Sequence, residues 1–192
     1  GTAQMGHDAG YYHTGKSEGC AFFTAFPFGF TMGEMAAWIK HGNGQKLWDE
    51  LYAPFGIRGF QAGSTGTQMF GWFRREIRSL ADLDGLKFRT PGNQGRVLQK
   101  LGVTPVSLPG GELFPALQSG AGDGAERVGP DNDLALGFYQ VCRYYYSPGY
   151  HEPGPALQLI VNEQAWRSLP SDLQAIVRAA ADAATTDMYA EY

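Results

Sequence analysis

The chain has 192 residues with 19 acidic and 15 basic side chains, so it lacks the basic surplus that is typical of nucleic-acid binding. With 43% hydrophobic and 18% charged residues it is not a disordered chain, and its length allows one large domain or two small ones. The most apolar stretch, 20–30, is shorter than the roughly 18 residues of a spanning helix, so we expect no membrane span.

The first 78 residues are rich in turns, and short helices are expected at 33–40 and 45–52. From Ser79 onward strand-like and helix-like segments alternate. Ser79 to Asp82 fits a helix start, because the serine accepts a backbone N–H and the acid favours the first turn. The segments after it are expected as a strand at 86–89, a helix at 94–101, an extended segment at 103–108, a helix at 112–119, and strands at 125–128, 141–146 and 157–161.

The last helix is expected to begin near Pro170. Its apolar residues share one stripe, which predicts a core-facing side. Strands that alternate with helices of about ten residues indicate an α/β fold with an at least partly parallel sheet. The stripe consists of Leu173, Ile176, Val177, Ala180 and Ala184.

The ends and the cysteines carry little information about compartment. Cys20 and Cys142 form no CxxC motif, and a disulfide between them is not predictable from sequence. The chain starts at Gly1 and stops inside a helical pattern at Tyr192, so we interpret it as a fragment, and the lack of a leader says nothing about export.

The segment Gly10 to Ser17, GYYHTGKS, matches the GxxxxGK[ST] pattern of phosphate-binding loops. Such a loop needs a buried strand before it and a long helix after it, and neither flank fits. A nucleotide-binding enzyme that uses Lys16 and Ser17 is therefore the alternative hypothesis.

Other chemistry-bearing patterns are missing from the sequence. The four histidines form no HExxH motif and no helical ligand pair, so each is expected to be exposed or hydrogen-bonded. No GxSxG nucleophile motif is present. We expect no enzyme activity.

Three charged residues lie where a strand or a glycine-rich turn ends. Arg89 closes the LKFR strand, and ligands of α/β sheets gather outside the carboxyl ends of strands. Its guanidinium could hold a carboxylate through two parallel hydrogen bonds. Glu126 and Glu152 lie in glycine-rich segments that allow close approach of a ligand.

The segment 66–77, GTQMFGWFRREI, resembles the DctP-type solute-binding proteins of tripartite ATP-independent periplasmic (TRAP) transporters. It is most similar to the branch that binds 2-oxo acids and related hydroxy acids. The likeness is specific because it continues in order along the chain, and that branch carries a similar Tyr-Tyr, Gly-Lys segment with no nucleotide role. The further matching segments are LDGLKFRTPG at 83–92, PGGELFPAL at 109–117, VGP at 128–130, YYYSPGYHE at 144–152 and LP at 169–170.

The resemblance implies a periplasmic protein with two α/β lobes and mixed sheets, which close on a ligand and deliver it to a TRAP membrane permease. Members of the family are longer at both ends, so the first lobe is expected to be incomplete. Residues 1–88 would be the rest of the first lobe, 89–155 the second lobe, and 156–192 a return strand and a truncated helix.

Carried over by position, the resemblance makes Arg89 the clamp of the ligand carboxylate. It also implies that Gln68, Glu126 and Glu152, with the backbone carbonyl of Arg127, hold a cation that grips the carboxylate and the 2-oxo or 2-hydroxy oxygen. Oxygen ligands of this kind suit a hard ion such as Na⁺ or Ca²⁺.

Arg127 departs from the family pattern, in which tryptophan is usual. Two glutamates, Arg89 and a bound monocarboxylate leave a net negative charge that Ca²⁺ would neutralise and Na⁺ would not. We therefore expect Arg127 either to reduce the need for a divalent ion or to turn outward and admit a bulkier acid.

Four aromatic residues are candidate apolar walls for the ligand, although such residues more commonly form plain core. Tyr12 and Phe70, together with Arg89 and Gln68, make up the predicted ligand-contacting set. The four aromatics are Tyr11, Tyr12, Phe70 and Trp72.

Overall fold

In a computed structural model that describes residues 3–106, 108 and 110–192, the chain forms two compact units. The first unit comprises the described residues up to 25, then 29–66 and 154–192, and the second comprises 26–28 and 67–153. Ser107 of the predicted extended segment and Pro109 of the PGGELFPAL motif lie outside the described residues. None of the helices described is long and apolar enough to cross a membrane.

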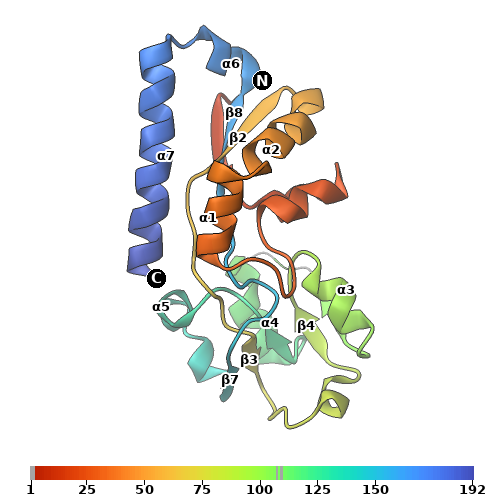
Figure 1. Cartoon of the computed structure of the whole chain (residues 1–192). Coiled ribbons are helices and arrows are strands. Elements are labelled where there is room, and N and C mark those ends of the chain that lie inside the picture. The colour runs from red at the N-terminus through yellow and green to blue at the C-terminus, as the bar shows by residue number, and fades with distance from the viewer. Residues whose placement is uncertain (1–2, 107, 109) are drawn as a thin grey trace. The chain divides into compact units, whose positions relative to one another are not determined.

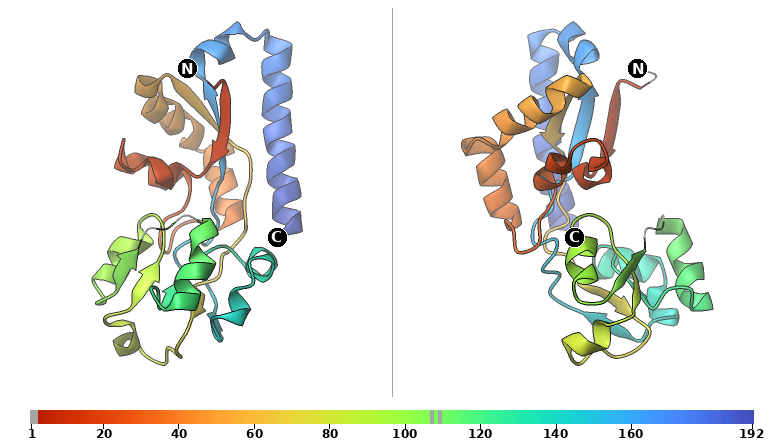
Figure 2. Two further views of the ribbon diagram at one scale, coloured as in Figure 1. Left: turned by 180° about the vertical axis from the view of Figure 1, so that it is seen from behind. Right: turned by 90° about the vertical axis from the view of Figure 1, so that its right-hand side faces the viewer.

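The first unit is built on a three-stranded antiparallel sheet in the order β1-β8-β2. The central strand β8 pairs along its length with both neighbours, so segments from the start, middle and end of the chain lie side by side (Figure 2). The strands are β1 (Met5–Asp8), β2 (Ile57–Gln61) and β8 (Gln158–Asn162).

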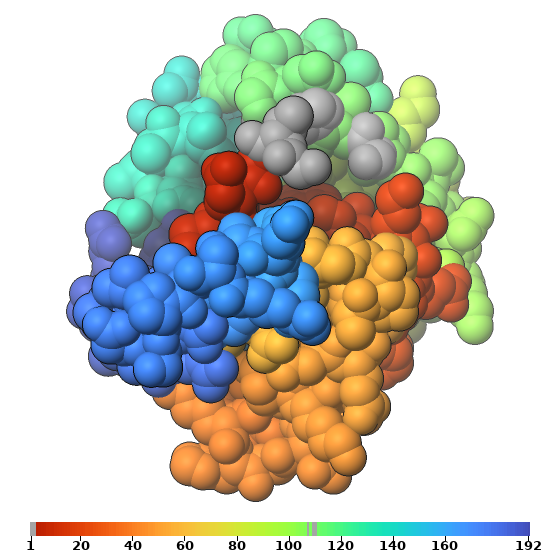
Figure 3. Space-filling view, turned by 90° about the horizontal axis from the view of Figure 1, so that it is seen from above, coloured from red at the N-terminus to blue at the C-terminus, as the bar shows by residue number. Residues whose placement is uncertain are grey.

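Helices cover both faces of this sheet, because successive side chains of a strand point to opposite sides. Ile160 packs against the cluster around Trp48 from α1 and α2, while Leu159 and Val161 pack with Trp166 of α6 and with α7. The helices flank the sheet in Figure 1, and α2 in orange and α6 in blue form part of the surface in Figure 3. The helices are η1 (Gly10–His13), η2 (Glu18–Phe23), α1 (Met32–His41), α2 (Gly44–Tyr52), η3 (Ala53–Phe55), α6 (Glu163–Ser168) and α7 (Ser171–Glu191), of which the η elements are 3₁₀ helices.

The predicted buried stripe of α7 is confirmed only at Val177, which packs against the cluster that contains Val161 and Trp166. Ala181 and Thr185 are buried in the described chain, whereas Ile176 is 60% exposed and Leu173 is also exposed. The face of α7 that packs on β2 therefore contains Ala181 and Thr185, each one residue beyond Ala180 and Ala184 of the predicted stripe. Small side chains fit there because the helix lies close to the sheet beside Phe60 and Val161.

The second unit holds a five-stranded mixed sheet in the order β5-β4-β6-β3-β7. The pairs β4–β5 and β4–β6 are parallel, and β3 runs antiparallel to β6 and β7. The predicted α/β fold with a partly parallel sheet is thus confirmed. The strands are β3 (Gly71–Phe73), β4 (Lys87–Arg89), β5 (Thr104–Val106), β6 (Gly124–Ala125) and β7 (Tyr144–Tyr146).

Two apolar clusters lie on opposite faces of this sheet. Phe73 and Phe88 pack with Leu98 of α3 on one face, and Trp72 and Ala125 pack with α4 and η6 on the other. The helix start expected at Ser79 to Asp82 is present, with Ser79 and Asp82 forming a capping box, although the helix that follows is a short 3₁₀ turn. The helices are η4 (Leu80–Leu83), α3 (Gln94–Gln99), η5 (Gly110–Glu112), α4 (Leu113–Ser119), α5 (Pro130–Ala135) and η6 (Phe138–Gln140).

The unit boundaries fall after residues 66 and 153, whereas the predicted lobe boundaries follow 88 and 155. The position after 88 lies inside the second unit, because β3 at 71–73 pairs with β6 and β7 of the same sheet. Strand β6 is also shorter than the predicted 125–128, and the chain leaves the sheet directly before Glu126.

Candidate functional site

The strand directions of the second unit bring the predicted site residues to one edge of its sheet. Arg89 ends β4, and Glu126 follows the last residue of the parallel strand β6. Strand β3 runs the opposite way, so Gln68, which precedes it, lies at this same edge. Strand β7 is antiparallel to β3 and leads into the loop that carries Glu152. Four segments that are distant in sequence therefore converge.

Arg89 is 8% exposed and its guanidinium is held by backbone oxygens. Nη1 donates to the carbonyl of Glu126 at 2.9 Å, and Nε donates to the carbonyl of Leu108 at 3.2 Å. Nη1 also lies 3.6 Å from Glu126 Oε2. These bonds fix the plane of the guanidinium without using Nη2, so the side chain is oriented before any ligand binds.

Glu126 is 1% exposed, and its two carboxylate oxygens differ in their surroundings. Oε2 accepts a long hydrogen bond of 3.4 Å from the Thr90 hydroxyl and lies close to Arg89. Oε1 has no hydrogen-bond partner among the residues described. A buried carboxylate oxygen without a donor is costly, which marks it as an atom that binds something.

Gln68 and Glu152 are both buried and are connected through their backbones. The amide of Gln68 donates to the carbonyl of Glu152 at 3.0 Å, and the amide of Gly149 donates to the carbonyl of Gln68 at 2.8 Å. The amide of Met69 donates to the carbonyl of Val128 at 2.9 Å, which ties the same segment to the chain beyond Arg127. The two segments that bear these predicted oxygen ligands are therefore tied to each other and to the chain beyond Arg127 at the sheet edge.

Arg127 is half-buried between Glu126 and Val128. Its Nε is inaccessible to solvent and makes no hydrogen bond within the described part of the chain. The side chain is thus not simply turned out into water.

His151 joins this group, and the expectation that each histidine is exposed or hydrogen-bonded is wrong for it. It is 2% exposed, and within the ranges described neither ring nitrogen has a hydrogen-bond partner. Its Nε2 lies 3.9 Å from Glu126 Oε1. The other three histidines fit the expectation, because His13 contacts Asp8, His7 contacts the carbonyl of Ala62, and His41 is exposed.

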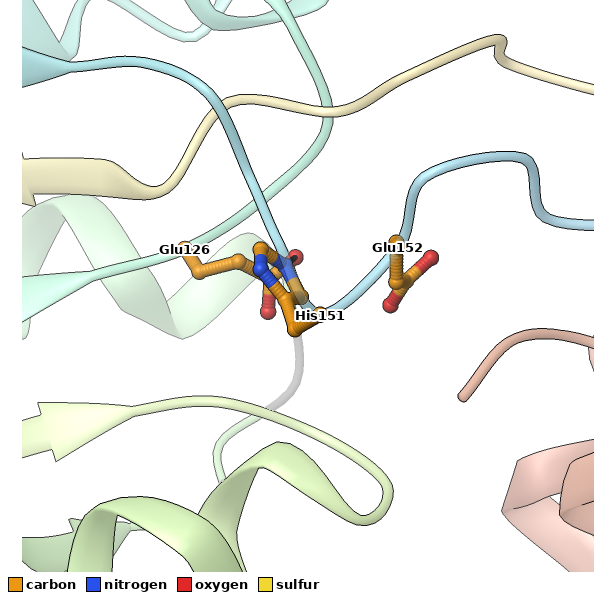
Figure 4. A group of neighbouring side chains, drawn as sticks. All are labelled: Glu126, His151 and Glu152. Atoms are coloured by element: carbon orange, nitrogen blue, oxygen red, sulfur yellow. Dashed lines mark ion pairs between the residues drawn. The ribbon is translucent and has the colours of Figure 1, made fainter. Parts of the chain in front are cut away.

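Glu126, His151 and Glu152 each offer one ligand atom, and these atoms all lie within 4.8 Å of one another (Figure 4). Figure 4 shows Glu126 reaching from the end of its strand toward the ring of His151, with Glu152 farther along the loop that carries His151. Two buried carboxylates this close repel each other unless positive charge lies between them. The residues present therefore fit a small cation that takes carboxylate oxygens.

Sequence reasoning missed His151 because it weighed each histidine against metal-ligand motifs. A usable signal was present: His151 directly precedes Glu152 in the turn PGYHEPG, a predicted ligand position.

The aromatic candidates lie in other surroundings. Tyr12 belongs to η1 of the first unit and is 58% exposed, and Tyr11 beside it is half-buried. Phe70 packs against the rings of Phe73, Phe88 and Tyr150 and lines an apolar cavity of about 660 Å³.

Trp72 lies on β3, where its ring stacks on that of Tyr145 at 4.0 Å. Its indole N–H donates to Asp133 at 2.9 Å. Asp133 is buried, and burial raises the pKa of its carboxyl. Trp72 therefore has a structural role, although its strand neighbour Ala125 directly precedes Glu126.

The GYYHTGKS segment does not form a phosphate-binding loop. It follows an antiparallel strand, its residues 10–13 form a 3₁₀ helix, and another short 3₁₀ helix follows Ser17. Lys16 is exposed. The nucleotide-binding alternative therefore has no structural support.

Comparison with known proteins gives concordant matches. The family model for bacterial extracellular solute-binding protein, family 7 (DctP), matches residues 1–192. The monocarboxylate 2-oxoacid-binding periplasmic protein of Nostoc sp. is 46% identical over the whole chain, which spans 53% of that protein.

Solved structures agree with this match. A TRAP periplasmic solute-binding protein from Pseudoalteromonas atlantica with bound sodium and pyruvate is 48% identical, with a TM-score of 0.95. One from Colwellia psychrerythraea with bound calcium and pyruvate is 49% identical, with a TM-score of 0.96. The chain is covered completely in both comparisons and spans 58% of each of those proteins, so it corresponds to little more than half of its relatives.

Proposed function

Since this chain belongs to the DctP family of bacterial extracellular solute-binding proteins, we propose that its protein captures a small 2-oxo or 2-hydroxy monocarboxylate. Capture takes place in the periplasm, and the ligand is passed to a TRAP-type membrane permease. The family consists of transport proteins and not enzymes, so the bound acid is released unchanged.

The observation that carries the proposal is the pairing of a fixed guanidinium with a carboxylate oxygen that has no donor. Arg89 is held by two backbone carbonyls beside the buried Glu126, whose Oε1 has no hydrogen-bond partner among the described residues. A site with this pair binds an anion through the arginine and a cation through the glutamate.

In this proposal each residue has a separate role. Arg89 clamps the ligand carboxylate, and its oriented fork selects a planar anion. Gln68, Glu126 and Glu152, with the carbonyl of Arg127, hold Na⁺ or Ca²⁺, the ions seen with pyruvate in the similar structures. The ion supplies positive charge for the carboxylate and the 2-oxo oxygen. Phe70 and Tyr12 remain proposed apolar contacts.

Charge balance explains why an ion is needed. Glu126, Glu152 and a monocarboxylate bring three negative charges near one Arg89. Buried like charges are costly unless they are compensated, so the acid and the ion should bind together. Affinity for pyruvate should therefore depend on the ion present.

Calorimetry with pyruvate on the full-length protein tests the clamp. Arg89→Ala should lose at least about 30-fold in affinity, because an unpaired buried carboxylate costs about 2–5 kcal/mol. Arg89→Lys should recover part of this loss, since lysine lacks the planar fork. Arg78→Ala, an exposed arginine of the same unit, is the matched control and should bind like wild type. Unchanged affinity in a folded Arg89→Ala would refute the clamp.

The bridging ion is tested separately, by titrating pyruvate with Na⁺, with Ca²⁺ and with chelator. Equal affinity under all three conditions would rule out an ion in the site. Delivery to a permease predicts that cells without this gene lose high-affinity uptake of labelled pyruvate, and unchanged uptake would contradict that part.

A further inference from the structure

Asp133 is a buried carboxylate that the proposed ligand and ion contacts leave unexplained. It is 1% exposed and lies in the short helix α5, which begins at Pro130, shortly after Glu126 in the chain. Its Oδ2 accepts hydrogen bonds from the indole N–H of Trp72 at 2.9 Å and from the Tyr145 hydroxyl at 2.7 Å. A carboxylate is costly to bury even when it is hydrogen-bonded, so its presence here calls for an explanation.

The two hydrogen bonds of Asp133 attach helix α5 to the strands that also hold the start of the segment 126–129. Trp72 of β3 is paired in register with Ala125, the last residue of β6, on one side and with Tyr145 of β7 on the other. The rings of Trp72 and Tyr145 are stacked at 4.0 Å. The segment 126–129 therefore leaves the sheet beside Trp72, and the helix that follows it is bonded back to Trp72.

Between these two anchors, the backbone of the segment is bonded to neighbouring parts of the second unit. The amide of Glu126 donates to the carbonyl of Arg89 at 3.0 Å, and the amide of Met69 donates to the carbonyl of Val128 at 2.9 Å. Strand β6 has only two residues, so sheet pairing alone gives the segment a short base. A short segment that is fixed at both ends holds its side chains and carbonyls in place for a ligand.

We propose that Asp133 is a positioning residue, which fixes the segment 126–129 by anchoring α5 to the sheet. The groups placed by this segment are the Glu126 carboxylate and the Arg127 carbonyl. This inference rests on the proposed function, because those groups are two of the proposed oxygen ligands of the cation. Asp133 itself contacts neither the ion nor the acid. Residues that orient the ligands of a metal without touching it typically contribute a factor of about 10–100 to metal affinity.

Hydrogen exchange on the full-length protein without ligand tests the anchoring directly. In Asp133→Ala the amides of Glu126 and Met69 should exchange at least about tenfold faster than in wild type, because the segment is released at one end. The amide of Thr104, which donates to the carbonyl of Leu86 at 2.7 Å in the same unit, should keep its wild-type rate. Equal acceleration at Thr104 would show a general loss of stability, and no acceleration at Glu126 would show no anchoring. Either result overturns the proposal.

Ion binding is the second readout, measured by titrating Ca²⁺ in the presence of pyruvate where circular dichroism shows a folded variant. Asp133→Ala should lose about 10- to 100-fold in Ca²⁺ affinity. Asp133→Asn should recover most of it, because the amide oxygen can accept both hydrogen bonds in place of Oδ2. Asp131→Ala, at an exposed aspartate of the same helix, is the matched control and should bind like wild type. Wild-type affinity in a folded Asp133→Ala would overturn the proposal.

A double-mutant cycle separates positioning from plain structural support. If Asp133 acts through the segment that carries Glu126, adding Asp133→Ala to Glu126→Gln should cost less than about threefold further in Ca²⁺ affinity. A loss by the same factor in both backgrounds would mean that Asp133 acts independently of Glu126, which contradicts the proposal.

These measurements also separate the inference from the proposed function. If wild type binds pyruvate with Ca²⁺ and Asp133→Ala binds equally well, the positioning role is wrong and the proposed function stands. If pyruvate does not bind to wild type with any ion, the proposed function is wrong. The exchange rate at Glu126 then still decides whether Asp133 fixes the segment.

Discussion

Each unit contains a group of buried polar side chains near its sheet, and the two groups differ in their hydrogen bonding: one in the first unit is paired, and the one around Glu126 in the second is not. In the first unit Tyr52 donates to Gln158 at 2.7 Å, Gln158 donates to Asp8 at 2.6 Å, and Asp8 pairs with His13 at 2.6 Å. Burial raises the pKa of Tyr52 to about 12, so its hydroxyl remains a donor. In this chain of hydrogen bonds, which runs from Tyr52 to His13, each of the four side chains has a partner.

In the second unit, the group of Glu126, His151 and Glu152, called the open cluster below, contains buried polar atoms without hydrogen-bond partners among the residues described. Within the residues described, Glu126 Oε1 and both nitrogens of His151 make no hydrogen bond. Buried polar groups are normally paired inside a protein. A buried group in which the side chains bond one another therefore indicates a structural role, and one that keeps unpaired atoms indicates a binding role. Substitutions in the hydrogen-bonded chain of the first unit should therefore reduce stability, and substitutions in the open cluster should reduce pyruvate binding.

Among the substitutions that test this comparison, Glu126→Gln is expected to change the measured free energy most. Removing the charge should weaken ion-dependent pyruvate binding by about 2–5 kcal/mol, at least about 30-fold, measured by calorimetry. Thermal stability should stay the same or rise, because a buried charge with an unsatisfied oxygen is removed. Glu112→Gln, at an exposed glutamate of the same unit, is the control. If Glu126→Gln instead lost much stability and bound pyruvate normally, Glu126 would have a structural role and not a binding role.

Gln158→Leu should show the opposite pattern. It leaves the hydroxyl of Tyr52 and an oxygen of Asp8 unpaired, so the free energy of unfolding should fall by about 1–3 kcal/mol in urea titrations. Pyruvate affinity should remain within about twofold of wild type. Gln164→Leu changes an exposed glutamine of the same unit and should be nearly neutral. The distinction between the units fails if Gln158→Leu instead abolishes binding.

A smaller effect on ion selectivity is expected at Arg127, which directly follows Glu126 in the chain and whose Nε is buried. Arg127→Trp removes a positive charge from the residue next to Glu126. The affinity for Ca²⁺ relative to that for Na⁺ should therefore rise by about 1.4 kcal/mol, about tenfold. Arg127→Met separates loss of charge from gain of an aromatic ring. Ion titrations in which neither variant changes the Ca²⁺/Na⁺ preference would mean that the guanidinium does not influence the site.

The smallest effect concerns an ion pair of the first unit. Two hydrogen bonds from Arg58, at 3.1 and 3.3 Å, hold the pKa of Glu163 below its ordinary value of 4.5. A lowered folded-state pKa gives stability that is present above pH 4.5 and is lost as the pH falls through the folded value. Glu163→Gln should therefore cost about 1 kcal/mol at pH 7 and progressively less in acid.

Urea titrations at pH 7 and pH 3 measure this difference, with Glu50→Gln at an exposed glutamate as control. A cost that is equal at both pH values would exclude the ion pair as its source.

The sequence predicts which strand or turn carries each site residue, but it does not predict from local patterns which of these strands lie next to one another. The alternation in LKFRTPG predicted that Arg89 ends a strand, and the structure ends β4 at that residue. The convergence of Gln68 with Glu126 depends on β3 running antiparallel to β6, and no local pattern specifies which strands become neighbours.

Two predictions failed for physical reasons, the first of them in part. The stripe on α7 was chosen by apolar content, but a helix lying close to a sheet buries the small Ala181 and leaves Ile176 exposed. His151 was judged alone, whereas its environment is made by Glu126, 25 positions earlier and brought beside it by the sheet. Burial without a partner becomes visible only once the chain is folded.

The stacked indole of Trp72 has a practical consequence. The other three tryptophans, Trp38, Trp48 and Trp166, belong to the first unit, so Trp72 is the sole indole of the second. It is paired in register with Ala125, next to Glu126, and its N–H is bonded to Asp133. A protein that keeps only this tryptophan would carry a native fluorophore one residue away from the open cluster, and its emission could follow ligand capture without any dye.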